Sequence, residues 1–171
     1  MARLAAFLVA GALANIVGAQ NVCPEDSKDA STVVKSSGRY YLVATTDSAK
    51  GDCTYVDFPT NVNEEQTPAS VTYGAKTGHE KSMSKHHATV KADGEKIIVT
   101  GESGEGSSTL LFSHKDVCHV VVGPTEHCEL WVRDSHTASG SYECCDTKFQ
   151  ECLKGRKVNF PYQEDSCVRK E

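Results

Sequence analysis

Short runs of alternating apolar and polar residues recur along the chain, a pattern typical of β-strands with one buried face. The clearest run is Arg39–Thr46 (RYYLVATT), which is rich in aromatic and β-branched residues. Further strands are predicted at Cys53–Phe58, Ala69–Tyr73, Lys81–Val90, Lys96–Thr100, Ser108–Ser113, Cys118–Val122 and His127–Arg133. Turns are expected at Ala92–Gly94 and Gly101–Ser108. Many short strands with turns at intervals of about 8–12 residues predict a sandwich or an up-and-down barrel.

Two segments instead repeat their apolar residues at helical spacing. Pro24–Lys35 carries three such residues and predicts a short amphipathic helix or a turn-rich lid. Tyr142–Lys154 places Cys145, Phe149 and Cys152 on one face of a second helix, which Gly155 ends. We expect that face to pack against the wall of the β-structure.

The first residues have the pattern of an export signal. Arg3 precedes an apolar run from Leu4 to Val17, and small residues follow up to Ala19. We therefore expect residues 1–19 to be a secretory signal peptide and residues 20–171 to form one domain. No long linker, internal repeat or low-complexity block divides that part of the chain.

Charge and cysteine content narrow the class of protein further. The formal net charge of −5 argues against nucleic acid or an anionic membrane as a partner. All eight cysteines follow the predicted signal, and an even number in an exported chain indicates a disulfide framework. Eight cysteines allow about 105 pairings, so spacing alone does not choose among them.

The sequence contains no pattern typical of catalysis or metal binding. His86 and His87 are adjacent, so in a strand they point to opposite faces and cannot easily share a metal. The histidine–carboxylate spacing of zinc hydrolases and the Gly-x-Ser-x-Gly elbow are both absent. We predict a binding protein and not an enzyme, without a metal or a cofactor.

The segment Glu129-Leu130-Trp131-Val132-Arg133 is the most informative for function. Strand alternation places Glu129, Trp131 and Arg133 on one face. A carboxylate beside an indole inside an apolar cavity is costly unless it is paired. One interpretation is that the two side chains receive a cationic ligand, with a cation–π contribution from the indole. The other is that Trp131 fills the core and an internal cation, His119 or an arginine, holds Glu129.

Several short motifs together carry a family resemblance. They are Cys-His-Val at 118–120, Glu-Leu-Trp at 129–131, Cys-Cys at 144–145, the final Cys167, Tyr-Tyr-Leu-Val at 40–43, Thr-Asp at 46–47, Asp-Cys at 52–53 and Thr-Tyr at 72–73. With these motifs the chain resembles the tick salivary lipocalins, the family of histamine-binding proteins and soft-tick moubatin-like scavengers. The resemblance extends over essentially the whole chain beyond the predicted signal.

The resemblance implies an eight-stranded antiparallel lipocalin barrel, all-β, with a short N-terminal helix and a C-terminal helix packed outside. It also implies a secreted protein, expected to be monomeric, whose cavity sequesters a small host mediator. By the family pattern the disulfides are Cys23–Cys144, Cys53–Cys167, Cys118–Cys145 and Cys128–Cys152. An exchange of partners between Cys144 and Cys145 is the alternative.

Strand alternation and the resemblance together predict the candidate ligand-binding residues, which are Tyr40, Tyr73, His119, Glu129, Trp131 and Arg133. The family's amine binders carry an aspartate where this chain has His119, so only one of two acidic groups is kept. We therefore expect first an eicosanoid, a leukotriene or thromboxane, with His119 at its polar head. The alternatives are a biogenic amine (histamine or serotonin) with Glu129 as its counter-charge and, in another class, a host plasma protein such as a complement factor.

Overall fold

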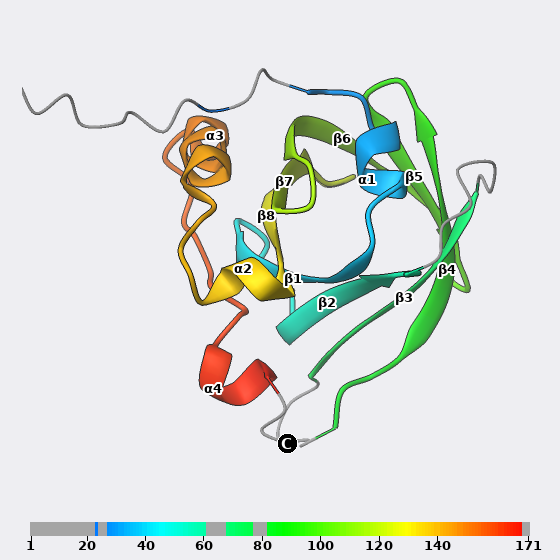
Figure 1. Ribbon diagram of the computed structural model, residues 1–171, viewed down its shortest axis with the longest axis horizontal. Helices are drawn as coiled ribbons and strands as arrows, with labels where there is room; N and C mark the ends of the chain where they lie inside the picture. The colour runs from blue at the N-terminus through cyan, green and yellow to red at the C-terminus, as the bar shows by residue number, and fades with distance from the viewer. Residues whose placement is uncertain (1–22, 24–26, 61–67, 77–81, 169–171) are drawn as a thin grey trace, which may run out of the picture.

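The computed structural model describes residues 23, 27–60, 68–76 and 82–168, and its centre is a closed antiparallel barrel (Figure 1). Each strand pairs with the next along the chain, and β1 pairs with β8 to close the ring. The strands are β1 Gly38–Thr45, β2 Asp52–Phe58, β3 Ala69–Lys76, β4 His86–Asp93, β5 Lys96–Gly101, β6 Gly104–His114, β7 Cys118–Val122 and β8 Cys128–Arg133. The predicted eight-stranded barrel is confirmed. The predicted signal peptide at residues 1–19 lies outside the described residues.

Four short helices flank the barrel. They are α1 Ser31–Val34, α2 Asp134–Thr137, α3 Glu143–Leu153 and α4 Glu164–Cys167. The α1 helix covers one end, where the Ala30 amide donates to the Gly94 carbonyl in the turn between β4 and β5 at 2.9 Å. Figure 1 shows α3 outside the ring of strands, where it contacts β6, β7 and β8. Among the helices of the described residues, none is long and apolar enough to cross a membrane.

Two predicted turns are displaced. The β4 strand continues to Asp93, so its hairpin turn is Gly94-Glu95. The β6 strand begins at Gly104, and its ladder with β5 includes most of the segment expected to be a turn. Glycine and serine there lack the apolar alternation that marks a strand, and pairing with β5 overrides their weak intrinsic preference. The α2 helix was not predicted, because its four polar residues show no helical periodicity.

Successive side chains of β7 and β8 point alternately into the barrel and toward its outer wall. The outward side chains lie in an apolar cluster under α3 with Phe149; they are Cys118, Val120, Cys128, Leu130 and Val132. The inward side chains, which line the interior cavity, are His119, Val121, Glu129 and Trp131. The pairing register places His119 opposite Trp131 and Val121 opposite Glu129. The predicted face of Glu129 and Trp131 is therefore confirmed.

The described residues form four disulfides: three fasten flanking segments to barrel strands, and Cys23–Cys144 joins the N-terminal segment to α3. Their pairs are Cys23–Cys144, Cys53–Cys167, Cys118–Cys145 and Cys128–Cys152. These are the pairs that the family resemblance implies, without the exchange at positions 144 and 145. Two of them join α3 to β7 and β8, so the helix is covalently held to the outer wall.

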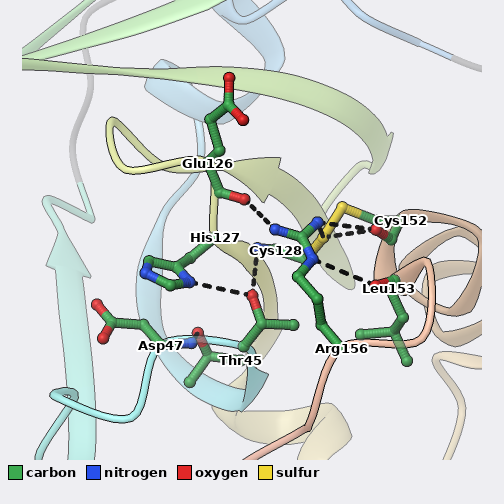
Figure 2. Close-up of a disulfide and its surroundings, with 9 residues drawn as sticks. Thr45, Asp47, Glu126, His127, Cys128, Cys152, Leu153 and Arg156 are labelled. Atoms are coloured by element: carbon green, nitrogen blue, oxygen red, sulfur yellow. Dashed lines mark hydrogen bonds between the residues drawn. A yellow bond between two sulfur atoms is a disulfide. The ribbon is translucent and has the colours of Figure 1, made fainter.

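Arg156 strengthens the junction between α3 and the β7–β8 loop (Figure 2). Its guanidinium donates to the Cys152 carbonyl at 3.0 Å, to the Leu153 carbonyl at 3.2 Å and to the Glu126 carbonyl. The carbonyls of Cys152 and Leu153 lie at the end of α3, where carbonyls have no partner within the helix. The arginine therefore caps α3 and ties it to the loop that precedes β8.

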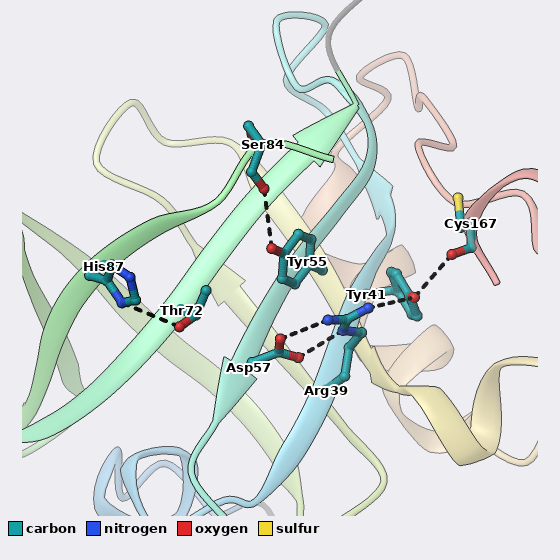
Figure 3. Close-up of polar contacts among 8 residues, drawn as sticks. All are labelled: Arg39, Tyr41, Tyr55, Asp57, Thr72, Ser84, His87 and Cys167. Carbon is teal, nitrogen blue, oxygen red and sulfur yellow. Dashed lines mark hydrogen bonds and ion pairs between the residues drawn. The ribbon is translucent and has the colours of Figure 1, made fainter. Parts of the chain in front are cut away.

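A second polar cluster lies on the outer face of β1 and β2 (Figure 3). The guanidinium of Arg39 donates twice to the carboxylate of Asp57, with both distances 2.7 Å, and lies 4.4 Å from the ring centre of Tyr55. The hydroxyl of Tyr41 donates to the carbonyl of Cys167 at 3.2 Å. This cluster holds the C-terminal segment against the wall of the barrel.

Candidate functional site

The interior of the barrel contains a cavity of about 280 Å³. Most of its wall is apolar, and the aliphatic and phenyl side chains include Val33, Phe58, Val71, Val90, Ile97 and Val121. Val33 comes from α1 at one end, whereas Lys50 and Pro124 come from the β1–β2 and β7–β8 loops at the opposite end. The volume lies just below the range of about 300–1,000 Å³ that is usual for drug-sized ligands. The cavity therefore suits one small molecule.

A buried carboxylate lies at the end of the cavity opposite α1. The Glu129 side chain is 8% exposed, and its Oε2 accepts a hydrogen bond from Trp131 Nε1 at 2.9 Å. Its Oε1 is 2.9 Å from the Nζ of Lys50, whose side chain is 33% exposed. Lys50 and Glu129 are the charged residues among the described residues that line the cavity. The carboxylate is thus inside the barrel, and the lysine reaches it from the solvent side.

His119 lies deeper in the cavity, where it is held by neutral groups. Its Nδ1 is 3.0 Å from the Ser113 hydroxyl, and its Nε2 is 3.2 Å from the Ser36 hydroxyl. Its ring stacks on Tyr40 with 4.9 Å between the centroids. Burial lowers the pKa of His119 from 6.5 to about 3, because the charged imidazolium would lose its hydration. The imidazole is therefore neutral at physiological pH.

The Ser36 hydroxyl indicates which ring nitrogen carries the proton. It donates to the carbonyl of Thr32 at 3.1 Å, so its oxygen is left to accept from His119 Nε2–H. The Ser113 hydroxyl then donates to Nδ1. Both ring nitrogens are satisfied by the protein, and the network connects the wall of the barrel to the residues of α1.

The other predicted site residues divide into two groups. Tyr40 and Tyr73 line the cavity, and Tyr73 also packs against His86 with 5.4 Å between the ring centroids. Arg133 is not among the cavity residues. It lies near the other end of β8, where its guanidinium is 3.5 Å from the Asp116 carboxylate and 3.3 Å from the Ser37 hydroxyl. Five of the six candidates are brought together, and Arg133 is separated from them.

The cation that holds Glu129 is neither of the groups considered from the sequence. His119 is neutral, and Arg133 pairs with Asp116. Lys50 has this role instead, and it comes from a polar loop with no apolar periodicity that could have placed it inside a barrel. A lysine close to a glycine at the end of a hairpin is a weak sequence signal, since most such lysines are solvated. Within the described part of the chain, no group of three or more histidine, cysteine or acidic side chains could hold a metal ion.

Comparison with known proteins identifies the family. The model of the tick histamine-binding protein family matches residues 23–169. The chain belongs to the tick histamine-binding protein family. Among solved structures, the crystal structure of AM182 in complex with serotonin is similar, with 36% sequence identity and a TM-score of 0.73. That match covers 84% of this chain and 96% of the AM182 chain.

Membership of the tick histamine-binding protein family indicates a ligand-binding protein rather than an enzyme. It also changes the order of the expected ligands. The eicosanoid expected first is not supported by either comparison, whereas both the family description and the similar structure refer to amines. The expectation relied on His119 to hold a lipid headgroup, but both nitrogens of that ring are occupied by serines.

The buried histidine predicts how the stability of this family member depends on pH. Below pH 6.5 the unfolded chain binds a proton at His119 that the folded chain does not bind until about pH 3. The free energy of unfolding therefore decreases as the pH falls, by about 1.4 kcal/mol per pH unit at most, or about 2 kcal/mol by pH 5. Denaturant titrations at pH 7 and pH 5 measure this decrease.

His119→Gln is the matched control, because a glutamine can still hydrogen-bond to hydroxyl groups but does not titrate. We expect the stability of this variant to fall less between pH 7 and pH 5 than that of the wild type. Equal losses in the two proteins would show that His119 does not contribute to the pH dependence.

Proposed function

We propose that the barrel binds a biogenic amine of the serotonin and histamine class, with Glu129 as the counter-charge of the ligand's ammonium group. The observation that carries this proposal is the buried Glu129 carboxylate, which lies inside the cavity and accepts a hydrogen bond from Trp131. A carboxylate in an apolar site strongly favours a cationic partner, since its attraction is little screened there. The indole ring adds an aromatic surface suited to a cation or to a second ring.

The size and lining of the cavity support a compact aromatic amine over a long-chain lipid. The cavity of about 280 Å³ has aromatic side chains at both ends, with Trp131 near the carboxylate and Tyr40 and Phe58 toward α1. An amine with one or two rings can place its ammonium at Glu129 and its rings against these side chains. The similarity to the serotonin complex of AM182 is consistent with this arrangement.

The physiological setting is part of the same proposal. A protein that sequesters a host amine has to be exported, and the apolar stretch before Ala19 together with the eight cysteines supports secretion. Residues 20–171 are then the mature lipocalin domain. The protein acts by lowering the free concentration of its ligand and needs no chemical step.

Calorimetric titration with a panel of ligands tests the proposed function. We expect saturable binding of serotonin or histamine with one ligand per barrel, because the cavity has room for one. Tryptophol, in which a hydroxyl replaces the amine of tryptamine, should bind much more weakly because it lacks the charge. Saturable binding of a leukotriene without any amine binding would contradict the proposal. It would support the eicosanoid ligand that we expected first from the sequence.

A further inference from the structure

We infer that Lys50 is a tethered cation that competes with the ligand's ammonium group for Glu129 and thereby sets the affinity of the barrel for amines. This inference rests on the proposed function, because it concerns the same carboxylate. It assigns a role to a residue of the β1–β2 loop that neither strand pattern nor family motif singles out.

The first observation is that both oxygens of the Glu129 carboxylate are already engaged. Lys50 Nζ lies 2.9 Å from Oε1, and Trp131 Nε1 donates to Oε2 at 2.9 Å. The lysine ammonium has the charge and the hydrogen-bonding capacity of a primary amine ligand. Lys50 Nζ therefore lies where the ammonium group of the proposed ligand would bind.

The second observation is the difference in burial between the two partners. The Glu129 side chain is 8% exposed, so as a lone carboxylate it would lack both hydration and a counter-ion. Lys50 supplies the counter-ion when no ligand is present. Its side chain is 33% exposed, so it can turn into water and be solvated there when another cation takes its place.

The two cations cannot share the carboxylate without a penalty. A ligand ammonium and Lys50 Nζ, both within contact distance of Glu129, would repel each other in a mostly apolar cavity where charges are weakly screened. Entry of the amine therefore requires the lysine to leave. The apparent association constant is the intrinsic one multiplied by the fraction of molecules in which Lys50 has already left Glu129, so it falls as that fraction becomes smaller.

The backbone of the β1–β2 loop is fixed, so the exchange involves the lysine side chain and not the loop. The carboxylate of Asp47 accepts a hydrogen bond from the Ala49 amide at 2.8 Å, and the hydroxyl of Thr54 donates to the Gly51 carbonyl at 2.6 Å. Gly51 also packs closely against β3, since a Cβ there would lie 2.9 Å from the carbonyl oxygen of Lys76. Lys50 is thus anchored at its Cα and free to rotate along its four-carbon stem.

The central experiment is calorimetric titration of Lys50→Met with serotonin at neutral pH. Methionine keeps an apolar stem of similar length and removes the charge. We expect serotonin to bind about tenfold more tightly than to the wild type, or tighter still if the lysine is rarely displaced. Lys50→Arg keeps the charge and should not gain affinity. Lys91→Met, at an exposed position of β4 away from the cavity, is the matched control and should leave the affinity unchanged.

Two further measurements separate charge competition from a change in loop structure. In the Glu129→Gln background, Lys50→Met should not increase the affinity for serotonin, because position 129 then has no carboxylate for which lysine and ligand compete. The neutral ligand tryptophol should bind Lys50→Met no more tightly than it binds the wild type. If Lys50→Met does not fold, Lys50→Gln provides the same test with a polar, uncharged side chain.

The outcomes distinguish this inference from the proposed function. If serotonin binds the wild type and Glu129→Gln removes binding, but Lys50→Met and Lys50→Gln show equal or weaker affinity, the competition is refuted and the amine site stands. If neither the wild type nor either Lys50 variant binds any amine, both the proposed function and the inference about Lys50 are wrong. Amine binding that is detectable only in the Lys50 variants would support the inference and show that Lys50 keeps the site closed to amines.

Discussion

Replacing Glu129 with glutamine lowers the affinity for serotonin by about 30-fold to several thousand-fold, equivalent to about 2–5 kcal/mol. The reason is that the ligand ammonium loses its counter-ion in an apolar cavity and still has to give up its hydration. Glutamine has nearly the same shape, so its side-chain oxygen can still accept from Trp131 and the wall of the cavity is kept. Calorimetric titration of the two proteins under the same conditions measures the loss.

Glu126→Gln is a suitable control for the charge change alone. Glu126 lies in the β7–β8 loop close to Glu129 in sequence, but its side chain is exposed and does not line the cavity. Serotonin affinity should be unchanged in this variant. If Glu129→Gln bound serotonin as tightly as the wild type, the ammonium would have to lie elsewhere, and the arrangement proposed for the ligand would be wrong.

Removing the disulfide between β7 and α3 with the double substitution Cys118→Ala and Cys145→Ala lowers the free energy of unfolding by about 3 kcal/mol. The two cysteines are separated by 27 residues, and opening a loop of this length increases the conformational entropy of the unfolded chain by about that amount. Both side chains are fully buried in the cluster under α3, so their loss also removes packing contacts. The midpoint and slope of a denaturant titration measure the effect.

The same double variant tests whether the outer wall and the cavity are independent. Cys118 points outward while His119, the next residue, points inward, and α3 contacts only the outer face of the strands. Serotonin affinity measured where the variant is folded should therefore match that of the wild type. An unchanged denaturation midpoint would mean that the Cys128–Cys152 disulfide and the packing around Phe149 hold α3 in place without the Cys118–Cys145 bond.

The sequence predicted which side chains of β8 share a face, because a strand has a strict period of two. Alternation in Glu129-Leu130-Trp131 placed the carboxylate and the indole on one face, and the structure shows that this face is the interior. Arg133 shares that alternation but lies near the end of the barrel where β8 finishes, and it pairs with Asp116. Periodicity predicts the face of the strand on which a side chain lies, but it does not predict how far along the barrel axis that side chain lies.

What the amino-acid sequence determined by itself is the class of fold: short alternating strands, an even number of cysteines and a thiol-rich helix that packs outside the barrel. Local patterns suffice to predict the class of fold, because the apolar residues of each strand themselves show which of its faces is buried. Only the tertiary structure decided which charged and neutral groups meet inside the cavity. It brings Lys50 from a polar loop to Glu129, and Ser36 and Ser113 to a neutral His119. The contacts of Lys50 with Glu129 and of Ser36 with His119 join residues far apart in the chain. The free energy of all these contacts depends on burial, which exists only once the barrel has closed.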